Sequence, residues 1–195
     1  MIRIQRAAGR VETPWRNGGG VTREVAVSPP GTGFTDFDWR ISIATVTGGG
    51  PFSVFPTADR ELAVLQGVLR LAIEGRDAVT VHSGSPAVRF PGDVPCIGEP
   101  QDGPVVDLNV MTRRGEFSSR VSWIPVERQH AIHAGAGRTF VLAVDPVTLL
   151  SRDLAYSLHT LDLAELQPED GPVALVARAA RCVFIELTAT AADKA

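Results

Sequence analysis

Glycine and proline interrupt this chain so often that only short secondary-structure elements fit between them. The 195 residues include 19 glycines and 14 prolines, spread along the whole sequence. The intervals hold short runs rich in Val, Ile, Leu and Phe, such as Trp39–Val46 and Val105–Met111. Sustained helical periodicity is nearly absent. Short apolar runs separated by turn residues are typical of strands, and their regular spacing favours a sandwich or a barrel.

Nine segments have the composition expected of strands: Val21–Val27, Trp39–Val46, Glu61–Gln66, Val68–Ile73, Ala87–Phe90, Val105–Met111, Phe117–Ile124, Thr139–Val144 and Cys182–Leu187. Two other segments are predicted differently. Pro146–Leu150 is expected to form a short helix, and Asp162–Leu166 to form either a helix or a turn.

The stretch Glu61–Asp93 is the most informative about the fold. It holds a strand, Gly67, a second strand and a turn at Glu74–Arg76, which together predict a hairpin. A second turn at Ser83–Ser85 and a strand that ends in Phe90–Asp93 follow. This order resembles the core of a cupin barrel. We therefore expect an all-β protein with a cupin-type (RmlC-like) β-barrel.

The rest of the chain predicts a second barrel. No linker rich in polar residues divides the sequence, and strand-like segments continue after about Val105. We expect residues 1–115 to form a first cupin-like barrel with the N-terminal strands. Residues 116–195 would form a second, degenerate cupin-like barrel that shares strands with the first, in a bicupin arrangement.

Composition and charge exclude several classes of protein. A hydrophobic fraction of 44% supports a real core, and a net charge of -3 without a basic stripe argues against a nucleic-acid partner. Cys96 and Cys182 form no CxxC pair and are expected to be buried free thiols. No secretory apolar region and no membrane-length apolar run is found, so we expect a cytoplasmic protein without membrane contact.

A cupin metal site is not expected. Cupins hold their metal with an HxH pair, a glutamate a few residues later and a further histidine. Counting back from Gly67 places Arg60 at the glutamate position, and Val54 and Pro56 near the HxH positions; the further histidine, expected near Pro95, is absent. Arginine stays protonated and only donates hydrogen bonds, so it cannot bind a metal. The sequence predicts no metal, no cofactor and a pocket that attracts anions.

The four histidines lie outside these motifs. His130 and His133 form an HxxH pair in a predicted loop, but no third ligand is spaced to complete a zinc site. We expect them to be solvated or capping residues. His82 and His159 are expected at the surface.

Strand alternation indicates which side chains share a pocket. Side chains of a strand point alternately to its two faces, which places Arg40 and Ser42 opposite an apolar face of Trp39, Ile41 and Ile43. The same rule places Asp107 and Asn109 on one face of the strand Val105–Met111.

Arg40, Arg60, Asp107 and Asn109 could therefore meet inside one barrel. Two arginines against one acid favour an anionic ligand, such as a dicarboxylate held by bidentate contacts. The alternative is an internal salt bridge with Asp107 that only satisfies the barrel interior. Arginine content alone decides nothing, because codon usage explains most arginines in a chain with a single lysine.

The segment Pro14–Glu24 contains three consecutive glycines after Asn17, which permit a tight turn. It lacks the Lys-Ser/Thr pair of a phosphate-binding loop, and no helix is predicted after it. One interpretation is a turn that leads into a strand. The other is a loop over the pocket mouth, with Trp15 as an apolar lid and Asn17 as a hydrogen-bonding group.

Six ordered motifs resemble the HutD/Ves family of bacterial proteins: PWRNGGGVTREVA, DWRISIATV, GPFSVFPTADREL, VLQGVLRL, FPGD and DLNVMTRRG. They span about Met1 to Gly115. The resemblance implies a two-barrel, cupin-like fold and a ligand-binding or regulatory accessory role in histidine utilisation, with acidic intermediates of histidine breakdown as ligands. It carries eight candidate ligand-binding residues over to this chain: Trp15, Asn17, Thr22, Arg40, Ser42, Arg60, Asp107 and Asn109.

Three functions follow as hypotheses. The first is a metal-free protein that binds a small anionic carboxylate metabolite, without nucleic acid and as a monomer or a homodimer. The second is a metal-independent isomerase or epimerase in which Asp107, or less favourably Glu24, acts as acid and base. The third is a structural protein whose pocket is vestigial.

Overall fold

The computed structural model describes residues 2–33 and 35–190, most of which lie in β-strands. The described residues contain fifteen strands and one short 3-10 helix, Pro168–Asp170. They form two compact units. We call residues 11–119 with Thr190 the site unit, and residues 2–10 with 120–189 the second unit. The all-β class predicted from the sequence is confirmed, and no described helix is long and apolar enough to cross a bilayer.

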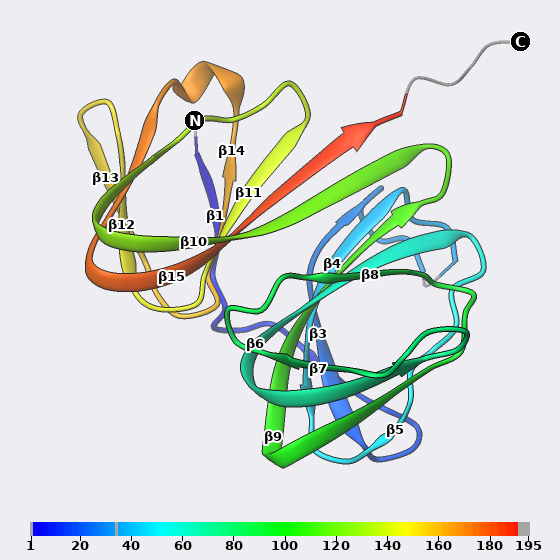
Figure 1. Ribbon diagram of the computed structural model, residues 1–195. Coiled ribbons are helices and arrows are strands. Elements are labelled where there is room, and N and C mark those ends of the chain that lie inside the picture. Colours follow the sequence, from blue (N-terminus) through cyan, green and yellow to red (C-terminus); the bar gives the residue numbers. More distant parts are fainter. Residues whose placement is uncertain (1, 34, 191–195) are drawn as a thin grey trace, which may run out of the picture. The chain divides into compact units, whose positions relative to one another are not determined.

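The site unit is built on one sheet that curls round on itself (Figure 1). Its strand order is β2-β3-β4-β9-β6-β7, with β5 paired to β9 and β8 paired to β6. The strands of this unit are β2 (Glu12–Pro14), β3 (Gly20–Ser28), β4 (Trp39–Val46), β5 (Gly50–Pro51), β6 (Ala58–Ile73), β7 (Val79–His82), β8 (Val88–Pro91) and β9 (Cys96–Arg113).

Two long strands allow this sheet to curl. β6 runs through Gly67, where two separate strands were predicted, and its pairing with β9 shifts in register on both sides of Gln66. Gly67 has a φ of 84°, a conformation that side chains with a Cβ rarely adopt. A Cβ there would also lie 2.8 Å from the Pro104 carbonyl oxygen. The glycine thus lets one strand bend and serve both ends of the sheet. The two strands predicted on either side of Gly67 are therefore one strand. The predicted turn at Glu74–Arg76 is confirmed, because β6 pairs with β7 across residues 74–78.

The second unit is also a curled sheet, with the order β1-β14-β11-β15-β12-β13 and β10 paired to β15 (Figure 1). Its strands are β1 (Arg3–Gln5), β10 (Phe117–Ile132), β11 (Arg138–Ala143), β12 (Val147–Ser151), β13 (Leu154–Leu158), β14 (Leu163–Leu166) and β15 (Val173–Ala189). Apolar side chains fill its interior, among them Val126, Val141, Leu149 and Leu175. Through the pairing of β1 with β14, the start of the chain belongs to this unit.

Both helical predictions are wrong. Pro146–Leu150 overlaps β12, in which Val147, Leu149 and Ser151 are buried while the residues between them are more exposed. This two-residue period is that of a strand with one buried face. Asp162–Leu166 overlaps β14, whose four residues are all buried between β1 and β11. A short apolar run buried on both faces carries no periodicity by which sequence reasoning can separate helix from strand.

The cysteines are buried and the histidines exposed, as the sequence predicted, but His130 lies in β10 and not in the predicted loop. Cys96 and Cys182 are buried free thiols. Burial is the main cause that raises the pKa of Cys96 to about 11 and that of Cys182 to about 12. The four histidines, His82, His130, His133 and His159, are all exposed.

Candidate functional site

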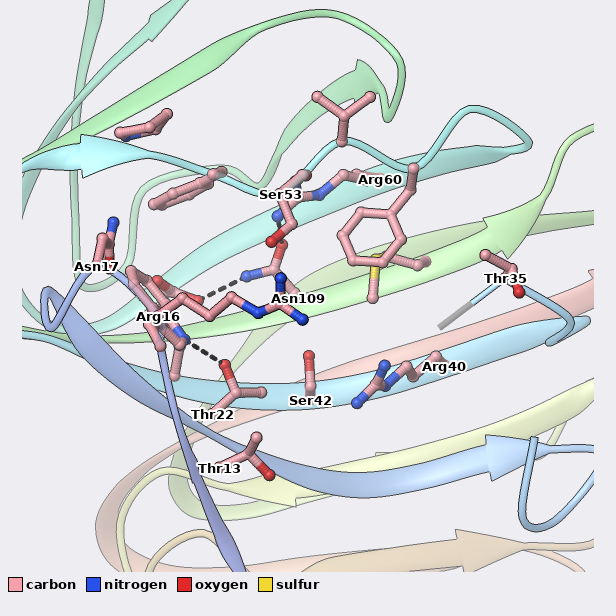
Figure 2. Close-up of a pocket in the computed structure, with 18 of the residues that line it drawn as sticks. Thr13, Arg16, Asn17, Thr22, Thr35, Arg40, Ser42, Ser53, Arg60 and Asn109 are labelled. Atoms are coloured by element: carbon pink, nitrogen blue, oxygen red, sulfur yellow. Dashed lines mark hydrogen bonds between the residues drawn. The ribbon is translucent and has the colours of Figure 1, made fainter. Parts of the chain in front are cut away.

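The site unit contains a cavity of about 750 Å³. A volume in this range suits a small molecule. Strands β2, β3, β4, β6 and β9 contribute to its wall, together with the turn at 15–19 and the segment 51–57 (Figure 2). The structure brings all eight residues singled out from the sequence to this one cavity: Trp15, Asn17, Thr22, Arg40, Ser42, Arg60, Asp107 and Asn109.

Strand register explains how distant residues meet in the wall. β9 lies between β4 and β6, and Met111 of β9 is paired with Arg40 on one side and Arg60 on the other. Two residues earlier, Asn109 is paired with Ser42 of β4. Because side chains of paired residues point to the same face of a sheet, these groups form adjacent rows on the cavity side. The predicted alternation in β4 is thereby confirmed.

Arg60 is the most enclosed cation of the site. Its side chain is buried, and its Nη2 donates a 2.6 Å hydrogen bond to Oδ1 of Asn109. Its Nη1 donates a 3.2 Å bond to the Ser53 carbonyl oxygen, and its Nε has no hydrogen-bond partner in the described structure. Burial lowers the pKa of the Arg60 guanidinium, and Cys96 and Asp107 partly offset this by electrostatic interaction. Arginine still keeps its charge at physiological pH.

Three phenyl rings surround the Arg60 guanidinium. Its Cζ lies 5.5 Å from the ring centroids of Phe52 and Phe55, and 5.0 Å from that of Phe90. Rings at such distances attract a cation through their quadrupoles, more strongly where water is excluded. The cage therefore holds the arginine in place without neutralising it.

Among the described residues of the cavity wall, Asp107 is the one carboxylate. It is completely buried, and its Oδ1 accepts a 2.7 Å hydrogen bond from Nδ2 of Asn109. Its Oδ2 has no partner in the described structure, and no arginine comes within ion-pair distance of it there. Burial raises the pKa of Asp107 to about 7, although the charge of Arg60 and the Asn109 hydrogen bond act in the opposite direction. The predicted alternative of a direct internal salt bridge is not what the structure shows.

Arg40 has a carboxylate partner outside the cavity wall. Its Nε lies 3.2 Å from Oε2 of Glu24, a half-exposed residue of β3. Burial lowers the pKa of the Arg40 guanidinium, and the charge of Glu24 opposes that shift. Arg40 therefore presents a partly compensated positive charge to the cavity.

The turn at 15–19 is held by specific contacts. The Trp15 indole Nε1 donates a 2.7 Å bond to the Thr22 hydroxyl, and its ring packs edge-on against Phe52 at 5.9 Å. Oδ1 of Asn17 accepts a 3.0 Å bond from the Gly19 backbone N–H. The segment is thus a tight turn that leads into β3, and it is also part of the cavity wall. It combines the turn and the pocket loop that the sequence offered as alternatives.

Sequence reasoning missed Arg16. This residue lies between Trp15 and Asn17 in the turn and lines the cavity. Figure 2 shows its side chain extending from the turn toward Asn109. The guanidinium is exposed and forms no ion pair or hydrogen bond with another described residue. Its place within the PWRNGGG motif was the available signal, but the side-chain direction of a turn residue follows no period.

The cavity wall does not suit the metal of a cupin. Val54, Pro56 and Arg60 all lie in the wall, where the sequence placed the former metal ligands. None of the three can coordinate a metal. Asp107 alone offers an anionic oxygen, and the described residues include no cluster of three or more His, Cys, Asp or Glu side chains that could hold an ion.

These features define a cupin-like β-protein whose pocket carries arginines in place of metal ligands. The fold resembles that of a cupin conserved-barrel protein from Leptotrichia buccalis, with a TM-score of 0.58 at 12% identity. The HutD family model matches residues 7–184, and the chain therefore belongs to the HutD family. The family resemblance deduced from the six motifs is confirmed.

Known structures and sequences agree with this assignment. A conserved protein of unknown function from Pseudomonas aeruginosa PAO1 has a TM-score of 0.85 and 30% identity, over 96% of this chain and 98% of that one. HutD from Pseudomonas fluorescens SBW25 has a TM-score of 0.81 and 28% identity, over 97% and 100%. Protein Ves of Citrobacter koseri is 39% identical over 109 residues, which are 55% of this chain and 56% of that protein. The chain thus spans little more than half the length of this curated relative.

Proposed function

We propose that this protein binds a small carboxylate anion in the cavity of the site unit and acts as an accessory or regulatory protein of histidine utilisation. The observation that carries the proposal is the excess of positive charge in the cavity wall. Arg16, Arg40 and Arg60 face one carboxylate, Asp107, which is buried and partly protonated near neutral pH. Of these three arginines, only Arg40 forms an ion pair with a described residue, Glu24.

Unused hydrogen-bond donors support an oxygen-rich ligand. A guanidinium has five N–H groups, and Arg60 uses only two of its nitrogens in hydrogen bonds to described residues. Asn109 gives one amide hydrogen to Asp107 and keeps the other. The Ser42 hydroxyl and the Arg16 guanidinium are not engaged by described residues. Donors that converge on one cavity match the acceptor oxygens of a carboxylate.

The apolar part of the wall limits the ligand to a small organic acid. Trp15, Phe52 and Phe55 lie beside the cations. Such surfaces bury methylene groups, whereas a phosphate or sulfate would gain nothing from them. A short carbon chain with one or two carboxylates fits both parts of the cavity.

Family membership supports the biological context. The relatives include HutD of Pseudomonas fluorescens, whose structure was determined in a formate condition, and a Pseudomonas putida protein from the region 3' of hutC. We propose that the ligand of this chain is an acidic intermediate of histidine breakdown.

We further propose that the two units are the barrels of a bicupin. The proposed first barrel lies within residues 11–119, and the proposed degenerate second barrel comprises residues 2–10 and 120–189, because β1 pairs with β14. Two curled sheets support this proposal. The apolar filling of the second unit supports the description of that barrel as degenerate, because it leaves the cavity of the site unit as the candidate ligand site.

Thermal unfolding with a ligand panel tests the binding function. A ligand that binds only the folded protein raises its Tm. We expect urocanate, N-formylglutamate, glutamate or formate to raise the Tm of the wild type and not that of Arg60→Gln. Arg70→Gln is the matched control, because Arg70 is an exposed surface residue of β6 paired with Glu99 outside the cavity. If none of the four acids shifts the wild type, or if Arg70→Gln loses the shift as well, the proposed function is wrong.

A metal-independent isomerase or epimerase is the second candidate. The pKa of Asp107, raised to about 7 by burial, suits a general acid or base near neutral pH. Proton exchange at the α-carbon of a bound amino acid in D2O, followed by NMR, tests this function. Exchange that the wild type catalyses and Asp107→Asn does not would favour it, and equal rates for both proteins would exclude Asp107 as the base.

A further inference from the structure

Asp107, Asn109 and Arg60 form a hydrogen-bonded chain with a fixed direction. Nδ2 of Asn109 donates to Asp107, and Oδ1 of Asn109 accepts from Arg60. The amide cannot be reversed, because a carboxylate requires a donor and a guanidinium requires an acceptor. Asp107 therefore orients Asn109, and Asn109 stands between the carboxylate and the cation. The Asp107 carboxylate therefore affects the cavity through Asn109, whose amide it orients.

Arg60 is the one cation of the described residues that compensates a charge on Asp107. The residues paired with Asp107 in the sheet are Ala44 of β4 and Val64 of β6, both apolar. The other titratable group that interacts with Asp107 is Cys96 of its own strand, whose thiol is neutral because burial raises its pKa to about 11. The second carboxylate oxygen of Asp107 has no hydrogen-bond partner among the described residues. Loss of the compensation from Arg60 would leave this carboxylate buried and isolated.

An anion in the cavity would remove that compensation. A carboxylate that binds Arg60 engages the same positive charge, and its own negative charge lies close to Asp107. Two carboxylates that share one cation in a buried site favour protonation of one of them. The ligand can keep its charge through Arg16 and Arg40, whereas no other described cation forms an ion pair with Asp107.

We infer that Asp107 is a positioning residue rather than a ligand contact, and that the protein binds its carboxylate together with one proton, which Asp107 takes up. This inference rests on the proposed carboxylate-binding function and deepens it. Affinity is then constant at pH values where Asp107 is already protonated. It falls about tenfold per pH unit above the pKa of Asp107 in the free protein, until the pKa of the complex is reached. Burial raises the pKa of Asp107 in the free protein, above which the affinity falls, to about 7.

Titration calorimetry with glutarate tests the coupling directly. Both carboxyl groups of glutarate are ionised above about pH 6, so the ligand itself takes up no proton. Measurements at each pH in two cationic or zwitterionic buffers that differ in ionisation enthalpy give the number of protons taken up. For the wild type we expect little uptake at about pH 6 and close to one proton per glutarate at about pH 8.5, with a Kd at least tenfold weaker at the higher pH. For Asp107→Asn we expect no uptake and a Kd independent of pH, because asparagine can still accept the bond from Asn109.

Asp93→Asn is the matched control. Asp93 lies in the same unit, outside the cavity wall, and pairs with Arg114. This variant should keep the wild-type proton uptake. Wild-type binding without proton uptake, or uptake that persists in Asp107→Asn, would overturn the inference and leave the proposed function intact. If the wild type binds no glutarate and none of the panel acids at any pH, the proposed function itself is refuted. The wild-type measurement decides the question even if Asp107→Asn does not fold.

Discussion

Replacement of Asp107 by asparagine should change stability in a way that depends on pH. Asp107 is completely buried, and burial raises its pKa from 3.8 to about 7. An acid whose folded pKa is higher than its unfolded pKa binds more protons in the folded state between these two values. Stability therefore falls as pH rises through this window, and the full penalty is present above the folded pKa. Asparagine carries no charge at any pH and avoids the penalty.

The size of the effect follows from the width of the window. Each unit of pKa shift corresponds to about 1.4 kcal/mol, so about three units give about 4 kcal/mol in total. An experiment between about pH 5 and about pH 8 covers roughly two of these three units, from pH 5 up to the folded pKa of about 7. We expect the free energy of unfolding of Asp107→Asn, relative to the wild type, to rise by about 3 kcal/mol across this interval. Packing differences between the two side chains cancel in this comparison, because they are the same at both pH values.

Urea denaturation at the two pH values, followed by tryptophan fluorescence, measures this difference. Asp93→Asn again serves as control, because the Arg114 ion pair lowers the pKa of Asp93 and keeps it ionised at both pH values. Its stability relative to the wild type should be the same at both. A difference between Asp107→Asn and the wild type that does not change with pH would show that the buried carboxylate has an ordinary pKa, and the reasoning would be wrong.

Four further predictions concern other parts of the site unit and the two thiols. Arg60→Lys should lose at least tenfold in carboxylate affinity by calorimetry, because an ammonium group cannot bond Asn109 and a ligand in the same fork geometry; an unchanged Kd would contradict the bidentate role. Arg16→Gln should leave the free energy of unfolding within about 0.5 kcal/mol of the wild type, since the side chain is exposed and forms no bond with a described residue. The same variant should weaken the binding of glutarate more than that of butyrate. Equal losses for both acids would show that Arg16 does not contact a second carboxylate. Gly20→Ala should lower the Tm clearly, because a Cβ would lie 2.5 Å from the Thr45 carbonyl oxygen and 3.3 Å from the Trp15 ring; a Tm equal to that of wild type would refute this. Cys96 and Cys182 should not react with a thiol reagent at about pH 8 until urea is added, since both are buried with raised pKa values; rapid reaction of the native protein would count against their burial.

Much of the site could be predicted because it lies on strands. A strand fixes which side chains share a face, so the sequence placed Arg40 with Ser42 and Asp107 with Asn109. Register between strands is not visible in the same way. The pairing of both Arg40 and Arg60 with Met111, and the interposition of Asn109, needed the structure.

The features that could not be predicted from the sequence show no strand or helix periodicity. Arg16 lies in a turn, where each residue's direction depends on local contacts. The phenyl cage combines Phe52 and Phe55 of the segment 51–57 with Phe90 of β8, and nothing in one of these segments predicts the other. The mistaken helices at Pro146–Leu150 and Asp162–Leu166 arose in short apolar runs, where tertiary burial rather than local propensity decides the structure.

The placement of β9 between β4 and β6 limits how the ligand preference proposed for this protein can be changed. Arg40 and Arg60, which we propose to meet the ligand's charge, stand on inner strands that pair with neighbours on both sides, so a substitution there also disturbs the sheet. The third cation, Arg16, lies in the turn at 15–19. The turn at 15–19 borders the same cavity but contributes few ladder contacts. Variation in this turn can alter the length or charge of the accepted acid while the inner strands keep their chemistry. Libraries directed at new ligands should therefore randomise the turn first and leave β9 unchanged.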